Sequence, residues 1–129
     1  MNVTLPLRQL SLLICCLGLG GPAQALCPDL DVFGLKNLVA THKVTPVVFF
    51  ASWCSECAAH LRQTLAPGTL LIATFDERHA AEAVVKQFAV TAPCYLDHGI
   101  AGVYRVKSVP MTLWLDHAGV PASLAPVQK

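Results

Sequence analysis

Two cysteines separated by two residues, Cys54 and Cys57, carry the clearest chemical signal in this chain. An apolar run at positions 47–51 precedes Ser52 and Trp53, and a helix-like pattern follows the second cysteine. Two thiols at this spacing can close into a disulfide and reopen. The start of a helix carries unpaired N–H groups and partial positive charge, which stabilise a thiolate. In such a setting the pKa of a cysteine falls from about 8.5 by roughly one to several units. The motif therefore predicts thiol–disulfide exchange.

Within this motif we predict that Cys54 is the nucleophile, because it lies first at the helix start, and that Cys57 resolves the mixed disulfide. His60 follows Cys57 by three positions, so both side chains project from one face of the helix. An imidazole titrating near about 6.5 could accept the Cys57 proton; the alternative is a solvated surface histidine. We expect Ser55 and Glu56 to tune the pair. A Glu56 carboxylate disfavours the thiolate and makes the disulfide less oxidising, unless it points into water.

The first 25 residues have the pattern of a secretory signal peptide. Arg8 is followed by an apolar stretch at positions 10–19 and by small residues at Ala23 and Ala25. The apolar stretch is shorter than the roughly 20 residues that span a bilayer. We therefore predict cleavage after Ala25, which leaves one domain at 26–129; the alternative is an uncleaved N-terminal membrane anchor. Export predicts an oxidising compartment outside the cytoplasm, such as the bacterial periplasm.

The predicted mature chain keeps four cysteines, Cys27, Cys54, Cys57 and Cys94. Four cysteines allow three pairings, and only Cys54 with Cys57 has a local argument. Cys27 and Cys94 either form a second, structural disulfide or remain free thiols, one reactive and one buried. Without Arg8, eight of the nine Lys and Arg residues remain beside eight Asp and Glu, so the formal net charge is zero. This balance gives no indication of a nucleic-acid partner.

Apolar runs alternate with helix-like segments along the rest of the chain. We predict strands at 45–51, 69–75, 94–96 and 111–115, helices at 31–41, 55–65, 78–88 and 100–104, an initial loop at 27–31, and a turn at 116–119 leading to a brief last strand near Val120. Alternation of this kind predicts a mostly parallel sheet with helices on both faces. The late turn between two short apolar runs predicts an antiparallel hairpin at the sheet edge.

Two segments resemble signatures of the thioredoxin superfamily. Residues 49–57, FFASWCSEC, resemble its active-site segment, and residues 109–119, VPMTLWLDHAG, resemble its cis-proline loop with the strand and hairpin that follow. Residues 93–106 resemble the strand–helix insertion of the exported TlpA/ResA/DsbE branch. The resemblance implies an α/β thioredoxin-like fold with a central mixed sheet flanked by helices. It also implies the insertion before the cis-proline loop and, from the few residues after the hairpin, a shortened C-terminus.

The resemblance also implies roles for residues around the cysteines. Pro110 would form a cis bond against the pair and keep metal from filling it, while Val109 would offer its backbone to an extended substrate. Trp53 would shield the motif and provide apolar contact surface. Two positions depart from the family pattern, since Val48 stands where thioredoxin has a buried aspartate and His60 where the TlpA branch often has a glutamate. Both departures concern proton transfer.

The leading hypothesis is an exported thiol–disulfide oxidoreductase that acts on protein cysteines without a cofactor. The branch resemblance and Glu56 favour the reductase direction, with a membrane-embedded thiol donor and a possible place in cytochrome c maturation. The alternative is a copper or other metal-delivery protein, because Cys54, Cys57 and His60 are soft ligands for Cu(I) or Zn. Covalent haem attachment is excluded, because Ala58 stands where C-x-x-C-H requires histidine. A further alternative is a non-catalytic module, with a partner or second copy on the sheet face that lacks a final helix.

Overall fold

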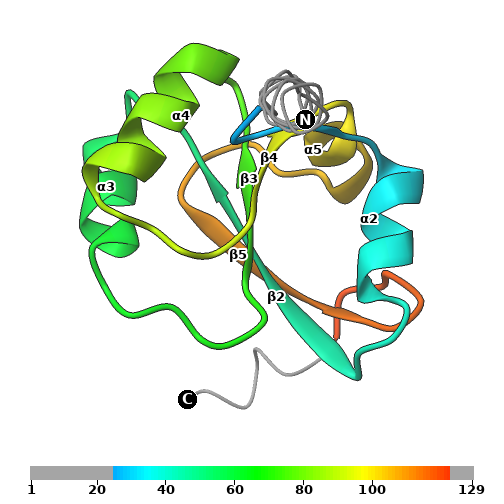
Figure 1. The fold of residues 1–129 in the computed structure, drawn as a ribbon. Helices are drawn as coiled ribbons and strands as arrows, with labels where there is room; N and C mark the ends of the chain where they lie inside the picture. The colour runs from blue at the N-terminus through cyan, green and yellow to red at the C-terminus, as the bar shows by residue number, and fades with distance from the viewer. Residues whose placement is uncertain (1–24, 123–129) are drawn as a thin grey trace, which may run out of the picture.

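The computed structural model describes residues 25–122, which form one mixed sheet between two layers of helices (Figure 1). In chain order the elements are β1 (Asp29–Leu30), α2 (Val32–Val39), β2 (Val44–Phe50), α3 (Ser55–Leu61), β3 (Leu70–Ala73), α4 (Arg78–Gln87), β4 (Cys94–Asp97), α5 (Ile100–Tyr104) and β5 (Met111–Asp116). The strand order is β1-β4-β3-β2-β5. Neighbouring strands are parallel except for β5, which runs antiparallel to β2. The predicted α/β architecture is confirmed.

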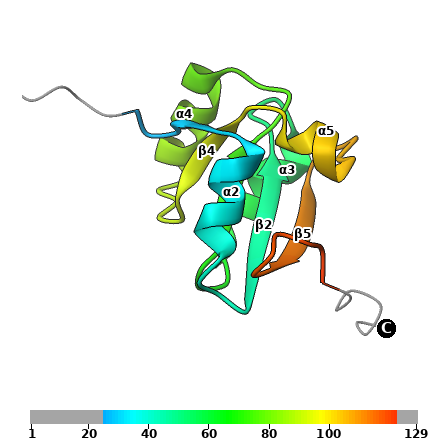
Figure 2. The ribbon, with the colours of Figure 1, turned by 90° about the vertical axis from the view of Figure 1, so that its right-hand side faces the viewer.

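Strand β2 lies inside the sheet and divides the interior into two apolar clusters. Its side chains alternate, so Val48 and Phe50 pack with α3 and α4, while Val47 and Phe49 pack with α2 and α5. The views agree: α3 and α4 lie on one side of the sheet, and α2 and α5 lie on the other (Figures 1 and 2). A continuous apolar run is what a strand covered on both faces requires.

Three predicted boundaries are wrong, and one of them is the strand at 69–75, which ends early, at Ala73. The initial loop at 27–31 contains β1, because the edge of β4 captures it: the Leu96 N–H donates to the Pro28 carbonyl at 2.8 Å, and the His98 N–H donates to Leu30 at 2.9 Å. Helix α3 ends at Leu61 and not near residue 65. The Gln63 N–H bonds to the His60 carbonyl, three residues back, which tightens the last turn and ends the helix.

Local signals set the start of α2 and the final turn as predicted. The Asp31 carboxylate caps α2 by accepting the Gly34 N–H at 2.8 Å. In the hairpin, Asp116 accepts the N–H groups of Val120 at 3.0 Å and Ala118 at 2.9 Å. Hydrogen bonds from the Val120 and Ala118 backbone lower the pKa of Asp116. The brief last strand is reduced to a single bridge between Leu115 and Pro121.

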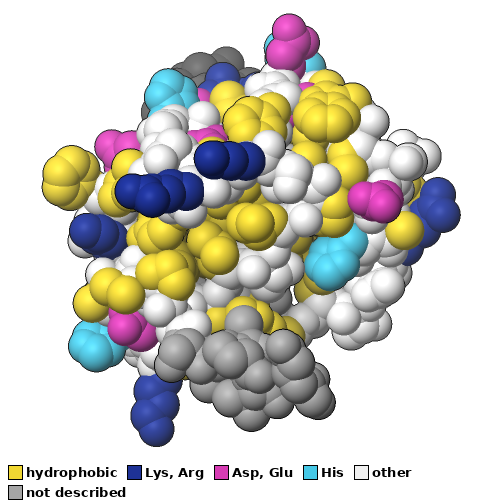
Figure 3. Space-filling model, turned by 180° about the vertical axis from the view of Figure 1, so that it is seen from behind, with side chains coloured by type: hydrophobic (Ala, Val, Ile, Leu, Met, Phe, Trp, Pro, Cys, Tyr) yellow, Lys and Arg dark blue, Asp and Glu magenta, His cyan; other side chains and the backbone are white. Residues whose placement is uncertain are grey.

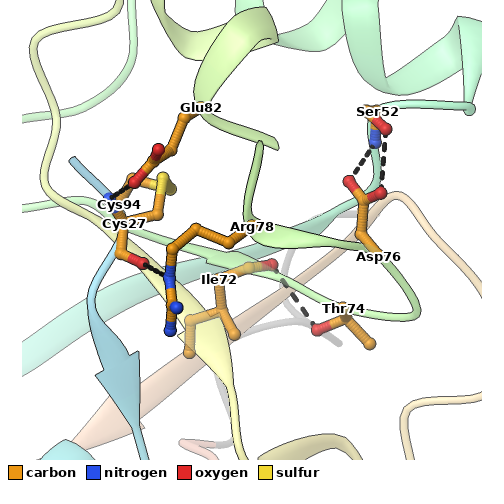
Figure 4. Close-up of a disulfide and its surroundings, with 8 residues drawn as sticks. All are labelled: Cys27, Ser52, Ile72, Thr74, Asp76, Arg78, Glu82 and Cys94. Atoms are coloured by element: carbon orange, nitrogen blue, oxygen red, sulfur yellow. Dashed lines mark hydrogen bonds between the residues drawn. A yellow bond between two sulfur atoms is a disulfide. The ribbon is translucent and has the colours of Figure 1, made fainter. Parts of the chain in front are cut away.

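A second disulfide fastens the segment before β1 to the edge of the sheet. Cys27 and Cys94 are buried and bonded to each other, with Cα atoms 4.7 Å apart and a sequence separation of 67. Helix α4 holds the same segment: the Cys27 N–H donates to Glu82 at 2.9 Å, and Arg78 Nε donates to the Cys27 carbonyl at 3.2 Å (Figure 4). Arg78 also pairs with Asp29. These contacts bring together residues that are far apart in sequence.

Several predictions concern the two ends of the chain and stay untested. Most of the predicted signal peptide and the segment at 123–129, where a final helix would lie, are outside the described residues. Within residues 25–122, no helix is long and apolar enough to cross a membrane. Seen from behind, hydrophobic side chains form separate surface groups with Lys and Arg side chains between them (Figure 3). The predicted partner or second copy on the sheet face without a final helix stays a prediction.

We predict that the buried Cys27–Cys94 disulfide stabilises the folded protein. Replacing both Cys27 and Cys94 with serine should lower the free energy of unfolding by about 2–4 kcal/mol, because the unfolded chain loses a long covalent loop. Urea unfolding of the oxidised proteins, followed by circular dichroism, measures the difference. The matched control replaces Cys54 and Cys57 with serine, which opens a much shorter loop and should cost less. An equal loss in both variants would contradict the assignment of Cys27–Cys94 as the stabilising bridge.

Candidate functional site

The cysteine pair lies where β2 ends and α3 begins. Cys54 is the N-cap residue of α3, and its Sγ accepts the Cys57 backbone N–H at 3.1 Å. The structure joins Cys54 and Cys57 in a disulfide with Cα atoms 5.2 Å apart. Cys54 is 8% exposed and Cys57 is 1% exposed. Cys54 is therefore the more accessible of the two residues, and after reduction the same N–H group and the helix dipole would stabilise its thiolate.

The loop before β5 lies against this pair. The Val109–Pro110 peptide bond is cis, as predicted. The Val109 carbonyl oxygen is 3.7 Å from Cys54 Sγ, so it can accept a hydrogen bond from the Cys54 thiol once the disulfide is reduced. Val109 packs against both apolar clusters. The antiparallel pairing of β5 with β2 carries this loop to the carboxyl end of β2, where Cys54 begins α3.

Phe75 and Asp76, which follow β3, hold the segment that precedes the cysteines in sequence. Asp76 accepts the Ser52 backbone N–H at 2.6 Å and the Ser52 hydroxyl at 2.8 Å (Figure 4). The Trp53 indole N–H donates to the Phe75 carbonyl at 2.9 Å. Phe75 has a φ of 58°, an uncommon backbone conformation for an aromatic residue. Trp53 and Phe75 are 65% and 53% exposed, so an apolar surface adjoins Cys54.

Sequence reasoning missed Phe75 and Asp76. The available signal was their position at the end of an apolar run that follows the active-site segment. The carboxyl ends of adjacent parallel strands meet at one edge of a sheet, and β2 pairs with β3 in parallel register from Val47–Leu70 to Phe50–Ala73. Sequence reasoning could therefore have predicted that a polar residue just after β3 would contact the loop after β2.

The other predicted site residues lie on or beside α3. Ser55 and Glu56 are exposed in its first turn, and His60 is half-buried in its last. No side-chain hydrogen bond or ion pair of His60 is found among residues 25–122. Val48 is buried in the cluster that contains Cys57, so the structure gives this sulfur an apolar neighbour on β2. The roles of Ser55, Glu56 and His60 stay predictions.

The metal-binding alternative gains no support from this geometry. In the part of the chain that the structure describes, no group of three His, Cys, Asp or Glu side chains could hold a metal ion. Cys54, Cys57 and His60 therefore do not form a ligand set here, although their sequence spacing suggested one.

The contact between Asp76 and Ser52 generates a prediction about the site. Replacing Asp76 with alanine should lower the free energy of unfolding by about 1–3 kcal/mol, because a part-buried N–H and hydroxyl lose their acceptor. It should also change the fluorescence of Trp53, whose partner Phe75 is the preceding residue. Urea unfolding and emission spectra of the oxidised protein measure both effects. Replacing the exposed neighbour Glu77 with alanine is the control, and equal effects from the two variants would contradict the proposed contact.

Comparison with known proteins relates this architecture to one fold. No sequence-family model and no curated protein matches the chain. Solved structures do match. A thioredoxin domain of a thiol-disulfide oxidoreductase from Bacteroides vulgatus superposes with a TM-score of 0.54 at 17% identity, covering 81% of this chain and 90% of that one.

A secreted Mycobacterium tuberculosis disulfide oxidoreductase, described as homologous to E. coli DsbE, superposes with a TM-score of 0.51 at 20% identity. The match covers 62% of this chain and 66% of that protein, which is just under two thirds of its length. A protein from Bacteroides thetaiotaomicron described as a disulfide isomerase gives 0.53 at 21% identity, covering 69% of this chain and 64% of that one. At these identities the likeness concerns the fold. The chain has the thioredoxin-like fold of thiol–disulfide oxidoreductases, with Cys54 and Cys57 close together at the start of α3.

Proposed function

We propose that this protein is an exported thiol–disulfide oxidoreductase that reduces disulfides in other proteins. The observation that carries the proposal is the position of Cys54. Its sulfur caps α3, accepts the Cys57 N–H at 3.1 Å and lies 3.7 Å from the Val109 carbonyl beside a cis proline. This arrangement offers a stabilised thiolate, a resolving thiol one turn away and backbone to which a substrate strand could bind.

The order of the two proposed steps follows from the greater exposure of Cys54 than of Cys57. In the reduced protein, the Cys54 thiolate attacks one sulfur of a substrate disulfide; a new mixed disulfide forms and the other substrate sulfur leaves as a thiolate. Cys57 then loses its proton and attacks the Cys54 sulfur, which releases the second substrate thiolate. The substrate gains two electrons, and Cys54–Cys57 becomes the disulfide. A second dithiol, which we propose is a membrane-embedded donor, returns those electrons.

The proposal includes a direction, the reduction of substrate disulfides, and a location outside the cytoplasm. Glu56 is exposed in the first turn of α3, and its carboxylate near Cys54 disfavours the thiolate. A less stable thiolate makes the disulfide harder to reduce and the dithiol a better reductant. The leader pattern in the first 25 residues supports export. The resemblance to the TlpA/ResA/DsbE branch makes the cysteines of apocytochrome c a candidate substrate.

Insulin reduction in the presence of dithiothreitol tests the proposed activity. We expect turnover by the wild type and none by Cys54→Ser. When reduced Cys57→Ser is freed of dithiothreitol and mixed with insulin, we expect a mixed disulfide to accumulate, because that variant can form the intermediate but cannot resolve it. Gel mobility under non-reducing conditions detects the intermediate. Mixed disulfides formed equally by both variants would contradict the assignment of Cys54 as nucleophile. Stoichiometric copper binding without turnover would favour the metal-delivery alternative.

A redox titration of Cys54–Cys57 tests the direction. A potential near about −270 mV is typical of a reductant and one near about −120 mV is typical of an oxidant. Performing the titration on a Cys27→Ser/Cys94→Ser background isolates the active-site pair. A value at the oxidant end would overturn the reductase proposal and leave thiol–disulfide exchange intact.

We also propose that His60 accepts the proton of Cys57. Replacing His60 with alanine should slow resolution of the mixed disulfide by about a hundredfold or more near neutral pH, the lower end of typical general-base effects. The loss should be smaller at high pH, where Cys57 ionises without help. Stopped-flow measurements between pH 5 and pH 8 follow the rate. His79→Ala, an exposed position on α4, is the control. An unchanged rate across this range would contradict the role of His60.

A further inference from the structure

A tight turn carries the chain from the end of β2 into α3. The Cys54 N–H donates to the Ala51 carbonyl at 3.2 Å and closes this turn, which has Ser52 and Trp53 at its two central positions. Cys54 then adopts the extended N-cap conformation, with φ −96° and ψ 112°. In that conformation its Sγ accepts the Cys57 N–H at 3.1 Å. The geometry of the turn therefore decides whether the sulfur meets the start of the helix.

Two residues from outside the turn hold its two central residues. Asp76 accepts the Ser52 backbone N–H at 2.6 Å and the Ser52 hydroxyl at 2.8 Å, so one carboxylate fixes both backbone and side chain (Figure 4). The Phe75 carbonyl accepts the Trp53 indole N–H at 2.9 Å. The Asp76 carboxylate is itself held at the start of α4, because it also accepts the Glu77 N–H at 2.9 Å. Three hydrogen bonds thus fasten the turn to the segment between β3 and α4.

The backbone of Phe75 has a conformation that regular secondary structure does not explain. Its φ is 58°, and Ala89 and Arg105 are the other non-glycine residues with positive φ in the described part of the chain. Those two follow α4 and α5, where a left-handed residue commonly ends a helix. Phe75 instead follows β3 and is 53% exposed, so neither a helix end nor burial of its ring accounts for the conformation. Strained backbone of this kind is concentrated at functional sites. Here the strained residue supplies one acceptor for the turn and directly precedes the other.

We propose that Asp76 is a positioning residue for Cys54, a role that rests on Cys54 as the nucleophile of the proposed function. By holding Ser52, the carboxylate keeps the turn closed and the reduced Cys54 sulfur in line with the Cys57 N–H. A hydrogen bond weakens steeply as its angle departs from linear, so a looser turn stabilises the thiolate less.

The negative charge of Asp76 acts in the opposite sense, because a nearby carboxylate disfavours a thiolate. That charge is dispersed over the N–H and O–H groups of Ser52 and the N–H of Glu77. The effect of position is therefore the larger of the two, and the net effect of Asp76 is to lower the pKa of the Cys54 thiol.

Alkylation of the reduced Cys57→Ser protein by iodoacetamide tests this role without requiring turnover. The backbone N–H at position 57 is retained, and mass spectrometry assigns the adduct to Cys54. In a plot of rate against pH, the midpoint reports the pKa of Cys54 and the plateau reports its access to the reagent. Asp76→Ala in this background should raise the midpoint and slow alkylation at pH 6 by about tenfold, because a thiol that leaves a helix start loses roughly this much thiolate.

Asp76→Asn is the matched variant. Its amide can accept the Ser52 N–H and donate to the Ser52 hydroxyl, so it keeps the turn closed without the charge. We expect it to be alkylated at pH 6 at least as fast as the parent. Equal midpoints for Asp76→Ala and Asp76→Asn would overturn the proposal, because the charge alone would then account for any change.

Other charged or titratable groups on the elements around Cys54 are common to these variants. They are Glu56 and His60 on α3, Glu77 before α4 and Lys107 in the cis-proline loop. Glu77→Gln in the same background is the charge control, since its side chain holds no part of the turn, and its midpoint should match that of the parent. A midpoint raised as far as that of Asp76→Ala would overturn the proposal.

Ser52→Ala examines the contact from the other side. It removes the hydroxyl and keeps the N–H, so alkylation at pH 6 should slow by about twofold or more, and by less than in Asp76→Ala. In the Asp76→Ala background it should add nothing further, because the hydroxyl acts through Asp76. Should Asp76→Ala fail to fold, Ser52→Ala decides alone, and an unchanged midpoint would overturn the proposal.

Single-turnover insulin reduction separates this role from the proposed function. With both cysteines present, Asp76→Ala should react about fivefold more slowly than the wild type at pH 7 and less than about twofold more slowly at pH 9, where the Cys54 thiol is ionised in both proteins. An equal loss at both pH values would assign Asp76 to stability alone and overturn the proposal. Absence of insulin reduction by the wild type would overturn the proposed function, and the alkylation midpoints would still decide whether Asp76 positions Cys54.

Discussion

The parallel pairing of β2 with β3 is the constraint on which the site depends. Its register, from Val47–Leu70 to Phe50–Ala73, brings the loops after the two strands to the same edge of the sheet. One loop carries Ser52, Trp53 and Cys54, and the other carries Phe75 and Asp76. Because β2 is buried on both faces, a shift of register by one residue would move each apolar side chain to the wrong cluster. The packing of the interior therefore fixes where the cysteines lie.

Different segments surround the carboxyl end and the amino end of β2. At its carboxyl end the chain turns at once into α3, and the helix start and cis-proline loop surround the cysteine pair. At its amino end, segments 61–69 and 88–93 link helices to strands and line a cavity. Short connections at one end and longer ones at the other explain why the cysteine pair and the cavity lie at opposite ends of the sheet without overlapping.

Covalent chemistry also serves two purposes in this chain. Cys54–Cys57 closes a short loop in which Cys54 is 8% exposed, whereas Cys27 and Cys94, at the edge of the sheet, are 0% and 4% exposed. In the second bridge, the backbone of Cys27 is hydrogen-bonded to the side chains of Glu82 and Arg78 from α4. The two disulfides therefore lie in unlike surroundings, and Cys27–Cys94 holds the segment before β1 against β4.

The sequence by itself determined what depends on local order along the chain. The strand and helix positions, the Asp31 cap, the Asp116 turn and the cysteine motif follow from periodicity and short-range hydrogen bonding, and Val109–Pro110 followed from a resemblance in one short segment. It could not supply β1 or the contact of Asp76 with Ser52. These depend on which strand edges meet and on residues 24 or more positions apart. Tertiary structure alone decided the Cys27–Cys94 pairing and the cavity beside segments 61–69 and 88–93, because only packing brings separated segments close enough to bond or to leave a space between them.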